Sequence, residues 1–556
     1  MAETKEHDKK VLHNLGYAQE LSRRMGGFSN FAISFSIICI LAGGISSFSA
    51  AFNSTGGGGA FVGWFIGGLF SLLVSFSMGQ IASAYPTAGG LYHWGSILGG
   101  KFWGWMTAWF NLLGLIFVVS SVDVYLYEVF FKGLLLDTVL KVDSSWFAAN
   151  EHLMVALILA SQALLNHYWV KVTTWLTDFS GYLIFALTII FIIALFAYSS
   201  VTIDLSRLFT FTNYTGDPGG GVIPSHTPSL FLGFFFGLIY VMYTITGFDA
   251  SGHTSEETHD AQVNVPKGMW TSVFYSWTFG LVMVAAFILA MPNLDEGAAL
   301  GFGAFNYMWS SLTMPYGLAV FLAVGFVVVN YICALAGLTS TSRMMYAFSR
   351  DGGLPFSNYL SRVGTTTRTP GYAIWTAIVL AYASTLYADA FLILATGCAV
   401  FLYISYMIPV IAGFLQEGKK WQQKGPFNLG SWSKPNAIVS AIGVALLTTT
   451  GFFPPNERVF YLTIAMIIGL LALWSRSTAI ASIVAAVVLW LGNRFGLITF
   501  IPSSAANVFL ALSLVIGLVV WFWYGGESER FEGVPEGEKI QQRQKMIAEI
   551  EKKYAE

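Results

Sequence analysis

The sequence contains few charged residues. Asp, Glu, Lys and Arg make up 10% of its 556 residues, whereas 55% are hydrophobic. A soluble globular protein carries about 25% charged residues, and no soluble fold of this length could bury so much apolar surface. Lipid is the solvent that fits this composition, so we expect an all-α polytopic membrane protein. The net charge of −2 also argues against nucleic acid as a partner.

Cysteine is scarce, and the histidines are scattered. Three cysteines lie in separate apolar runs, as small core residues do, and not in a disulfide or metal pattern: Cys39, Cys333 and Cys398. His167, His253 and His259 lie near predicted helix ends without metal-ligand spacing. We therefore expect no metal, no cofactor and ordinary polar roles for these histidines. A membrane enzyme would need acids, bases and nucleophiles at one depth, and the sequence offers no such set.

Long apolar runs are abundant. A transmembrane helix needs roughly 20 apolar residues, and fourteen runs of suitable length occur, at 28–52, 59–82, 102–131, 152–168, 176–198, 230–251, 270–291, 313–342, 371–386, 391–415, 437–454, 457–474, 477–493 and 504–524. Only Ser475 and Arg476 separate the runs 457–474 and 477–493. Treating that pair as a hairpin gives twelve spans and the same topology. The four glycines at 56–59 are expected to form a flexible connection.

The basic residues indicate the orientation. With the N-terminus inside and the spans alternating, 23 of the 28 lysines and arginines fall on the inner side and five on the outer side. Inner loops of membrane proteins carry this excess of positive charge. We expect a multi-pass protein of the plasma (cytoplasmic) membrane with both termini in the cytoplasm.

The spans group into consecutive segments. We expect a cytoplasmic segment at 1–27, a first five-helix repeat at 28–198, an extracellular loop at 199–229, a second five-helix repeat at 230–415, accessory helices at 416–524 and a cytoplasmic tail at 525–556.

Two spans carry glycine-containing interruptions. Span 1 contains Ala42, Gly43, Gly44 and Ile45 near its middle, and span 6 contains Thr246, Gly247, Phe248 and Asp249. Spans 1 and 6 begin the two five-helix sets and run in opposite directions, as an inverted repeat requires. Glycines that merely allow close helix packing are the alternative interpretation.

Interrupted helices create a binding site from backbone alone. The N-terminal end of a half-helix exposes N–H groups that attract a carboxylate, and the C-terminal end exposes C=O groups that attract an ammonium. A zwitterionic or ω-amino acid suits such a site without any dedicated charged side chain. We therefore expect these eight residues to bind the substrate.

Four stretches resemble the amino acid–polyamine–organocation superfamily, and within it the amino acid/choline transporter family. They are LGYAQEL at 15–21, SAYPTAGGLYHW at 83–94, GFDASGHTSEET at 247–258 followed by VPKG at 265–268, and SRMMYAFSRDGGLP at 342–355. The resemblance implies the leucine-transporter fold, with two inverted five-helix repeats and two further helices. The additional spans near 457–493 depart from that plan, giving two to four accessory helices.

The resemblance implies a secondary permease that works by alternating access. Its substrates would be amino acids or small amines such as GABA or choline, with coupling to protons, to sodium or by exchange. A nutrient sensor built on a transporter scaffold and a channel are the alternatives. Proteoliposome uptake tests the sensor, and saturable counterflow tests the channel.

Three charged positions form a candidate inner gate. Arg23 and Arg24 precede span 1 and Asp351 follows span 8, and in the implied fold these ends meet at the cytoplasmic exit. A pair between them would hold the inner path shut. Alternatively, the two arginines only satisfy the orientation rule.

Asp249 is the acid most suited to function. A carboxylate at this depth is costly unless it is paired, hydrated or protonated. Three roles remain open: a proton carrier, a partner of a substrate ammonium, or a cap on a half-helix, where Asp is a common choice.

Overall fold

The computed structural model describes residues 2–553 except 224–225, 387–389, 454–455 and 499–500. The chain is 78% helical, and its described residues form no β-strand. The first half contains α1 (Ala2–Asn14), α2 (Gly27–Ile38), the π-helix η1 (Ile40–Gly44), α3 (Ile45–Ala84), α4 (Leu91–Gly99), α5 (Lys101–Tyr125), the π-helix η2 (Leu126–Leu140), α6 (Ser145–Ala149), α7 (Glu151–Tyr168), α8 (Val170–Tyr198), the 3-10 helices η3 (Leu205–Leu208) and η4 (Asp217–Gly219), α9 (Leu230–Thr244), α10 (Ala250–His253), the 3-10 helix η5 (Ser255–Glu257) and α11 (Ala261–Ala290).

The second half is also helical. It contains α12 (Leu294–Ala299), the 3-10 helix η6 (Gly301–Gly303), α13 (Ala304–Ser311), α14 (Tyr316–Arg350), α15 (Ser357–Leu360), α16 (Gly371–Thr385), α17 (Ala390–Gln416), the 3-10 helix η7 (Gly430–Trp432), α18 (Ser433–Thr450), α19 (Glu457–Trp474), α20 (Arg476–Arg494), α21 (Ser503–Val519), the π-helix η8 (Val520–Tyr524), α22 (Glu527–Arg530) and α23 (Glu538–Lys552). Each of the fourteen apolar runs thus contains helix. Within the described residues, nine helices are long and apolar enough to cross a membrane, and the first of them combines spans 1 and 2.

The glycine run between spans 1 and 2 is helical, so the expected flexible connection is wrong. A kink at Thr55 and Gly56 divides α3, and the three glycines that follow lie in the helix and are buried. Glycine is needed there because the outer loop packs onto the helix: a Cβ at Gly57 would lie 2.4 Å from the Arg207 carbonyl oxygen. The glycines therefore allow a close approach.

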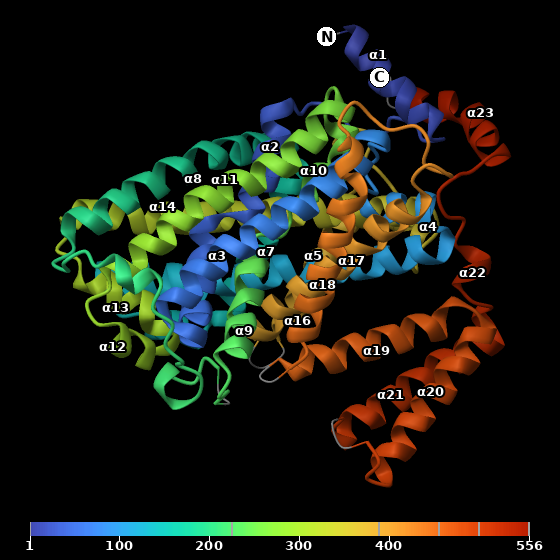
Figure 1. The fold of residues 1–556 in the computed structure, drawn as a ribbon. Coiled ribbons are helices and arrows are strands. Elements are labelled where there is room, and N and C mark those ends of the chain that lie inside the picture. The colour runs from blue at the N-terminus through green and yellow to red at the C-terminus, as the bar shows by residue number, and fades with distance from the viewer. Residues whose placement is uncertain (1, 224–225, 387–389, 454–455, 499–500, 554–556) are drawn as a thin grey trace.

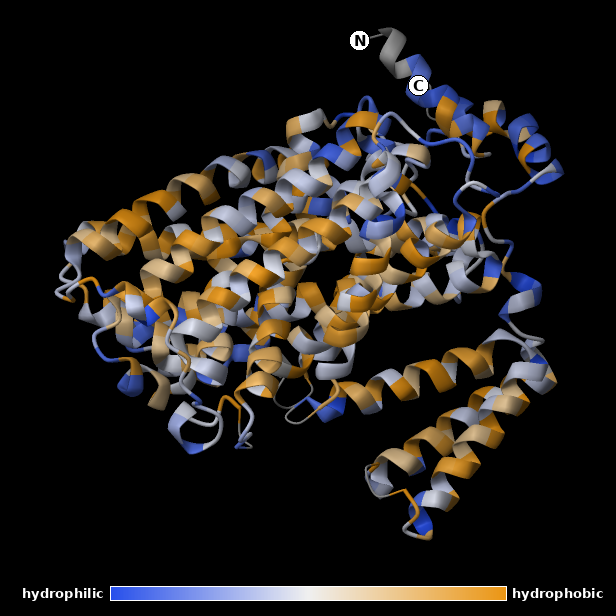
Figure 2. Ribbon diagram, viewed as in Figure 1, coloured by the Kyte–Doolittle hydropathy of each residue, from blue (hydrophilic) through white to orange (hydrophobic). Residues whose placement is uncertain are grey.

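The core of the bundle is formed by α3, which packs on α9 and α11, and by α5, which packs on α17. Apolar residues cover these long helices, and polar residues concentrate at the ends of the bundle (Figure 2). Numerous serines, threonines and asparagines are nonetheless fully buried inside. Buried polar groups in a bilayer need partners within the protein, and these partners define the site described below.

Helices α20 and α21 lie to one side of the main bundle, which they reach mainly through α19 (Figure 1). Together with α19 they bury a separate small cluster, formed by Ile468, Ala486, Ile501, Ala506 and Phe509. All three helices lie within 416–524, the segment expected to hold the accessory helices.

The two terminal helices lie at the same end of the molecule, where α1 and α23 contact each other (Figure 1). Glu551 of α23 is 2.5 Å from Lys9 Nζ and 2.7 Å from His13 Nε2 of α1. Its Oε1 also accepts a hydrogen bond from the Gln19 amide at 2.9 Å. Contact between the termini requires an even number of membrane crossings.

We therefore expect protease tags at the two ends of the chain to be cleaved from the same side of sealed vesicles. A tag in the loop at Leu205–Leu208 should be protected from that side and serves as the control. Cleavage of the two terminal tags from opposite sides would contradict the packing of α1 on α23.

Candidate functional site

Span 1 is interrupted at Cys39. Helix α2 ends at Ile38, and Cys39 adopts φ 23° and ψ 87°, a conformation rare for a residue with a side chain. The chain then resumes as the wide turn of η1 and continues into α3. Gly43 and Gly44 lie inside this resumed segment, so the interruption falls four residues before Gly43.

Span 6 is interrupted between α9 and α10. Helix α9 ends at Thr244, and Gly247 adopts φ 81°, which favours glycine. Two tyrosines of α17 satisfy the backbone groups freed here. The Tyr403 hydroxyl donates to the Ile245 carbonyl at 3.0 Å, and the Gly247 amide donates to the Tyr406 hydroxyl at 3.1 Å. The interruption thus falls within the stretch predicted from the sequence.

The two interruptions pack against each other. The Ser34 hydroxyl of α2 donates to the Phe248 carbonyl at 3.0 Å and accepts from the Ser251 amide, also at 3.0 Å. A Cβ at Gly43 would lie 2.9–3.1 Å from Thr244, and one at Gly247 only 2.2 Å from Ile37. Glycines at both positions are therefore required for this close contact.

The eight residues predicted to bind substrate are all buried, and the five that are not glycine are at most 3% exposed. In span 1, the Ala42 and Gly43 amides both point to the Cys39 carbonyl oxygen, at 2.7 and 2.9 Å. The Ile45 amide donates to the Ala42 carbonyl. Two N–H groups therefore converge on one acceptor at the start of the resumed helix.

Side chains from α17, α5 and α10 surround the Asp249 carboxyl group. Its Oδ1 accepts from the Tyr406 hydroxyl at 2.9 Å. Its Oδ2 accepts from Asn111 Nδ2 of α5 at 2.9 Å and lies 3.2 Å from His253 Nε2. The side chain makes no capping bond to α10 in the described structure, so the capping role considered for Asp249 is absent here.

His253 holds a proton on the ring nitrogen that faces away from Asp249. Its Nδ1 lies 3.2 Å from the Ala88 carbonyl oxygen, which can only accept, so Nδ1 must carry hydrogen. The Nε2–Oδ2 contact becomes a hydrogen bond when one further proton lies on Nε2 or on the carboxyl group. The geometry thus allows Asp249 and His253 to hold a proton between them. Sequence reasoning missed this pair, although the i, i+4 spacing signals that the two side chains share a helix face.

The end of α14 is tied to the segment after span 6 by two buried ion pairs. Arg350 Nη2 lies 2.9 Å from Glu256 Oε1, and Arg343 Nε lies 2.7 Å from Glu257 Oε1. Burial raises the pKa of Glu256, but the charge and hydrogen bond of Arg350 outweigh it, so the pKa lies below its ordinary value. Ion pairs therefore join the stretch 247–258 to the stretch 342–355, the last two of the four that resemble the transporter family.

The predicted gate residues do not come together. Among the described residues, neither Arg23 nor Arg24 pairs with Asp351. Arg23 binds Gln19 and the Thr258 carbonyl and lies 3.7 Å from Asp8, while Arg24 donates to Ser22. Asp351 is paired instead with Arg543 of α23, at 2.8 Å. No pattern in the sequence predicts this pair, whose members lie 192 residues apart.

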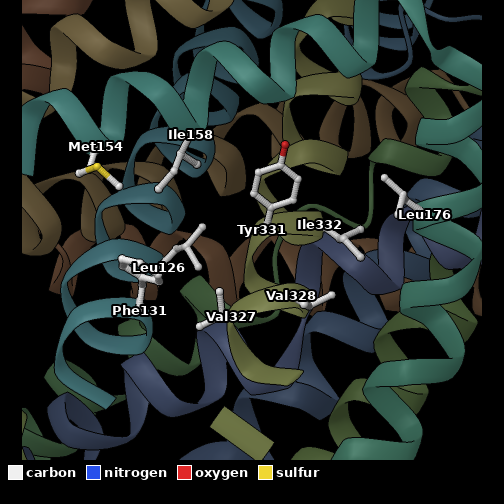
Figure 3. Close-up of a pocket in the computed structure, with 9 residues that line it drawn as sticks. All are labelled: Leu126, Phe131, Met154, Ile158, Leu176, Val327, Val328, Tyr331 and Ile332. Atoms are coloured by element: carbon white, nitrogen blue, oxygen red, sulfur yellow. The ribbon is translucent and has the colours of Figure 1, made fainter. Parts of the chain in front are cut away.

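A cavity of about 300 Å³ lies at the side of the bundle (Figure 3). Its lining is apolar and comes from η2, α7, α8 and α14: Leu126, Phe131, Met154, Ile158, Leu176, Val327, Val328, Tyr331 and Ile332. The Tyr331 hydroxyl is hydrogen-bonded to the Ser161 hydroxyl at 2.7 Å. Such a lining suits lipid chains and offers nothing to a zwitterion, so it is separate from the site at the two interruptions.

Two interrupted spans packed at their breaks, in a bundle of apolar helices, are the architecture of a polytopic membrane transporter. Residues 25–473 match the family model for amino acid permeases, and the chain belongs to this family.

Relatives from plants and fungi support the assignment. The chain is 31% identical to the amino-acid permease BAT1 of Arabidopsis thaliana, over 80% of this chain and 88% of the relative. It is also 31% identical to the BAT1 homolog of Oryza sativa subsp. japonica, with 81% and 88% coverage. It is 26% identical to amino-acid permease 2 of Neurospora crassa, with 81% and 82% coverage. These relatives are permeases by name, so the chain is a transporter of amino acids and not an enzyme.

The contact between the interruptions predicts the effect of one added methyl group. Gly43→Ala places a Cβ against Thr244, and such overpacking costs about 1–3 kcal/mol. We expect a lower unfolding temperature in detergent and weaker amino acid binding. Gly317→Ala is the control, since nothing lies within 4 Å of a Cβ there, and it should leave both quantities unchanged or slightly raise stability. Equal behaviour of the two variants would contradict the described contact.

Proposed function

We propose that this permease carries zwitterionic amino acids across the plasma membrane by alternating access, driven by the proton gradient. The observation that carries the proposal is the packing of two helix interruptions against each other in the buried centre of the bundle. Each supplies the end of a half-helix, and the two ends have opposite electrostatic character. A substrate with both a carboxylate and an ammonium matches this pair, and choline, which lacks a carboxylate, does not.

The carboxylate is assigned to span 1. The Ala42 and Gly43 amides already converge on an oxygen atom, the Cys39 carbonyl. A carboxylate oxygen is an acceptor of the same kind and carries more charge, so it forms stronger hydrogen bonds with such donors. We propose that the substrate displaces the Cys39 carbonyl when the site opens, with Gly44 and Ile45 extending the same N-terminal turn.

The ammonium is assigned to span 6 and α5. Asn111 Oδ1 is buried and has no hydrogen-bond partner among the described residues, while its amide nitrogen is held on Asp249. An unpartnered buried acceptor is costly, and an ammonium, which only donates, satisfies it. The main-chain carbonyls of Thr246 and Gly247 lie on the same interruption and complete the proposed acceptor set with Phe248.

The coupling proton is assigned to the Asp249–His253 pair, which makes Asp249 a carrier. The titratable groups of other elements that face it are Tyr406, Tyr403 and Cys398 of α17. The pair shares one proton while buried, and a substrate ammonium arriving beside Asn111 changes the electrostatic cost of keeping it. Release of this proton on the side of lower proton concentration would then drive accumulation. The positive-inside distribution of lysine and arginine supports cytoplasmic termini. Symport with protons that enter the cell would carry the amino acid inward.

Uptake into proteoliposomes tests the proposal. Wild-type protein should accumulate a labelled neutral amino acid above equilibrium when the outside is acidic, and only equilibrate it without a pH gradient. Transport-inactive protein that still binds amino acids would support the nutrient sensor instead.

The carrier role makes a sharper prediction. Asp249→Asn and His253→Gln should lose accumulation driven by the pH gradient but keep exchange of internal for external amino acid, because exchange needs no proton release. The control is His152→Gln, at an exposed histidine of α7, which should accumulate as wild type does. Loss of affinity at every pH in Asp249→Asn would instead make Asp249 a direct partner of the substrate ammonium.

A further inference from the structure

Arg543 of the C-terminal helix reaches a buried carboxylate at the end of the transport core. Its Nη1 lies 2.8 Å from Asp351 Oδ1, and the Asp351 side chain is fully buried. The same guanidinium holds Glu532 through Nη2 at 3.0 Å. The main chain adds a further link, since the Glu532 amide donates to the Asp351 carbonyl at 3.0 Å. The tail is therefore fastened to the residue that follows α14.

Asp351 gathers side chains from the other elements of this end. The Tyr17 hydroxyl, ahead of span 1, and the Tyr92 hydroxyl of α4 each donate to Oδ2 at 2.8 Å. His93 Nε2 lies 3.3 Å from the same oxygen. Burial raises the pKa of the Asp351 carboxyl. The hydrogen bond with His93 and the charge of Arg543 outweigh burial and hold this pKa below its ordinary value, so the group is ionised at neutral pH.

A second anchor fixes the tail to the N-terminal helix. Glu551 binds Lys9, His13 and the Gln19 amide, as described above. In turn, Asp8 of α1 accepts hydrogen bonds from the Asp260 amide at 2.8 Å and the Ala261 amide at 3.1 Å, at the start of α11. The tail and α1 thus form one connected layer with the end of α14 and the starts of α4 and α11.

We propose that the C-terminal segment from Glu527 to Lys552 is a lock on the inner path, with Arg543 as the cation that holds it closed. The inference rests on the proposed function, since it assumes that this end of the bundle opens during transport. Opening must separate the end of α14 from α4 and from the segment ahead of span 1. A buried carboxylate without its cation is strongly unfavourable. The path therefore opens only when Arg543 and Asp351 separate and water reaches both charged groups. Arg543 is thus a positioning residue for the gate and makes no contact with substrate.

The three native cysteines are built-in reporters of this opening. All are buried in the closed form, and Cys39 lies at the interruption of span 1. A membrane-impermeant maleimide, applied from the tail side of sealed vesicles, should label Cys39 slowly in the wild type. We expect Arg543→Gln to raise this rate on the order of ten-fold, as for loss of a coupled pair. Lys545→Gln, an exposed position on the same helix, is the matched control and should label as slowly as the wild type.

Further variants separate a lock from simple misfolding. Glu551→Gln weakens only the second anchor and should give a smaller rise, while Arg543→Lys, which keeps the charge, should stay near wild type. Asp351→Asn should make the additional change Arg543→Gln nearly silent, because the pair is already lost. All variants should retain the wild-type elution volume and unfolding profile in detergent.

Two results would overturn the lock. Cys39 labelling that is unchanged in Arg543→Gln shows that the tail does not control access. Additive effects of Asp351→Asn and Arg543→Gln show that the two residues do not act as a pair. Neither result depends on amino acid uptake, so the lock and the proposed function fail separately: a wild type that transports no amino acid contradicts the function, and its labelling pattern still reports on the tail.

Discussion

Backbone groups freed by a break in a membrane-spanning helix must be satisfied inside the protein, because the bilayer offers them no water. This constraint governs the centre of the permease. The breaks at Cys39 and Gly247 each release donors and acceptors, and side chains of neighbouring helices bind them. Ser34 serves the Phe248 carbonyl and the Ser251 amide, while Tyr403 and Tyr406 serve the residues on either side of Thr246. The buried hydroxyl groups of Ser34, Tyr403 and Tyr406 therefore satisfy backbone groups of the span 6 interruption.

The same constraint is the basis on which we propose that the site binds a zwitterion. A freed group that a neighbouring hydroxyl or carbonyl satisfies in this structure is a group that a substrate could satisfy in its place. In this proposal the substrate carboxylate replaces the Cys39 carbonyl, and the ammonium binds the unpartnered Asn111 Oδ1. Such an exchange of internal partners for substrate partners would suit a carrier that must also release its cargo.

The fold was largely predictable because lipid imposes a strong pattern on sequence. Run length alone predicted helix in all fourteen segments, and the break in span 6 was located by Gly247, whose φ of 81° only glycine tolerates readily. The break in span 1 was misplaced by four residues, since it falls on Cys39, which carries no glycine signal. There the strained conformation is held by tertiary contacts, such as the Cys333 thiol 3.1 Å from the Ile37 carbonyl.

The contacts that the sequence did not reveal are those between distant segments. Charge alone does not choose among the several cations that could pair with Asp351, and Arg543 of the tail, not Arg23 or Arg24, is the one that pairs. His253 was given an ordinary polar role although Asp249 lies four residues before it, and the Ala88 carbonyl beside its other ring nitrogen lies 165 residues away. Such choices depend on packing that one sequence does not encode in a local pattern.

We propose that the paired interruptions bind both ends of an amino acid. The most direct test is equilibrium binding to purified protein of the amino acid found in uptake, beside its amine without the carboxylate and its acid without the amine. Each truncated analogue should bind about a hundred-fold or more weakly, since each leaves buried polar groups of one interruption unpaired. Binding of either analogue as tightly as the intact amino acid would contradict the claim.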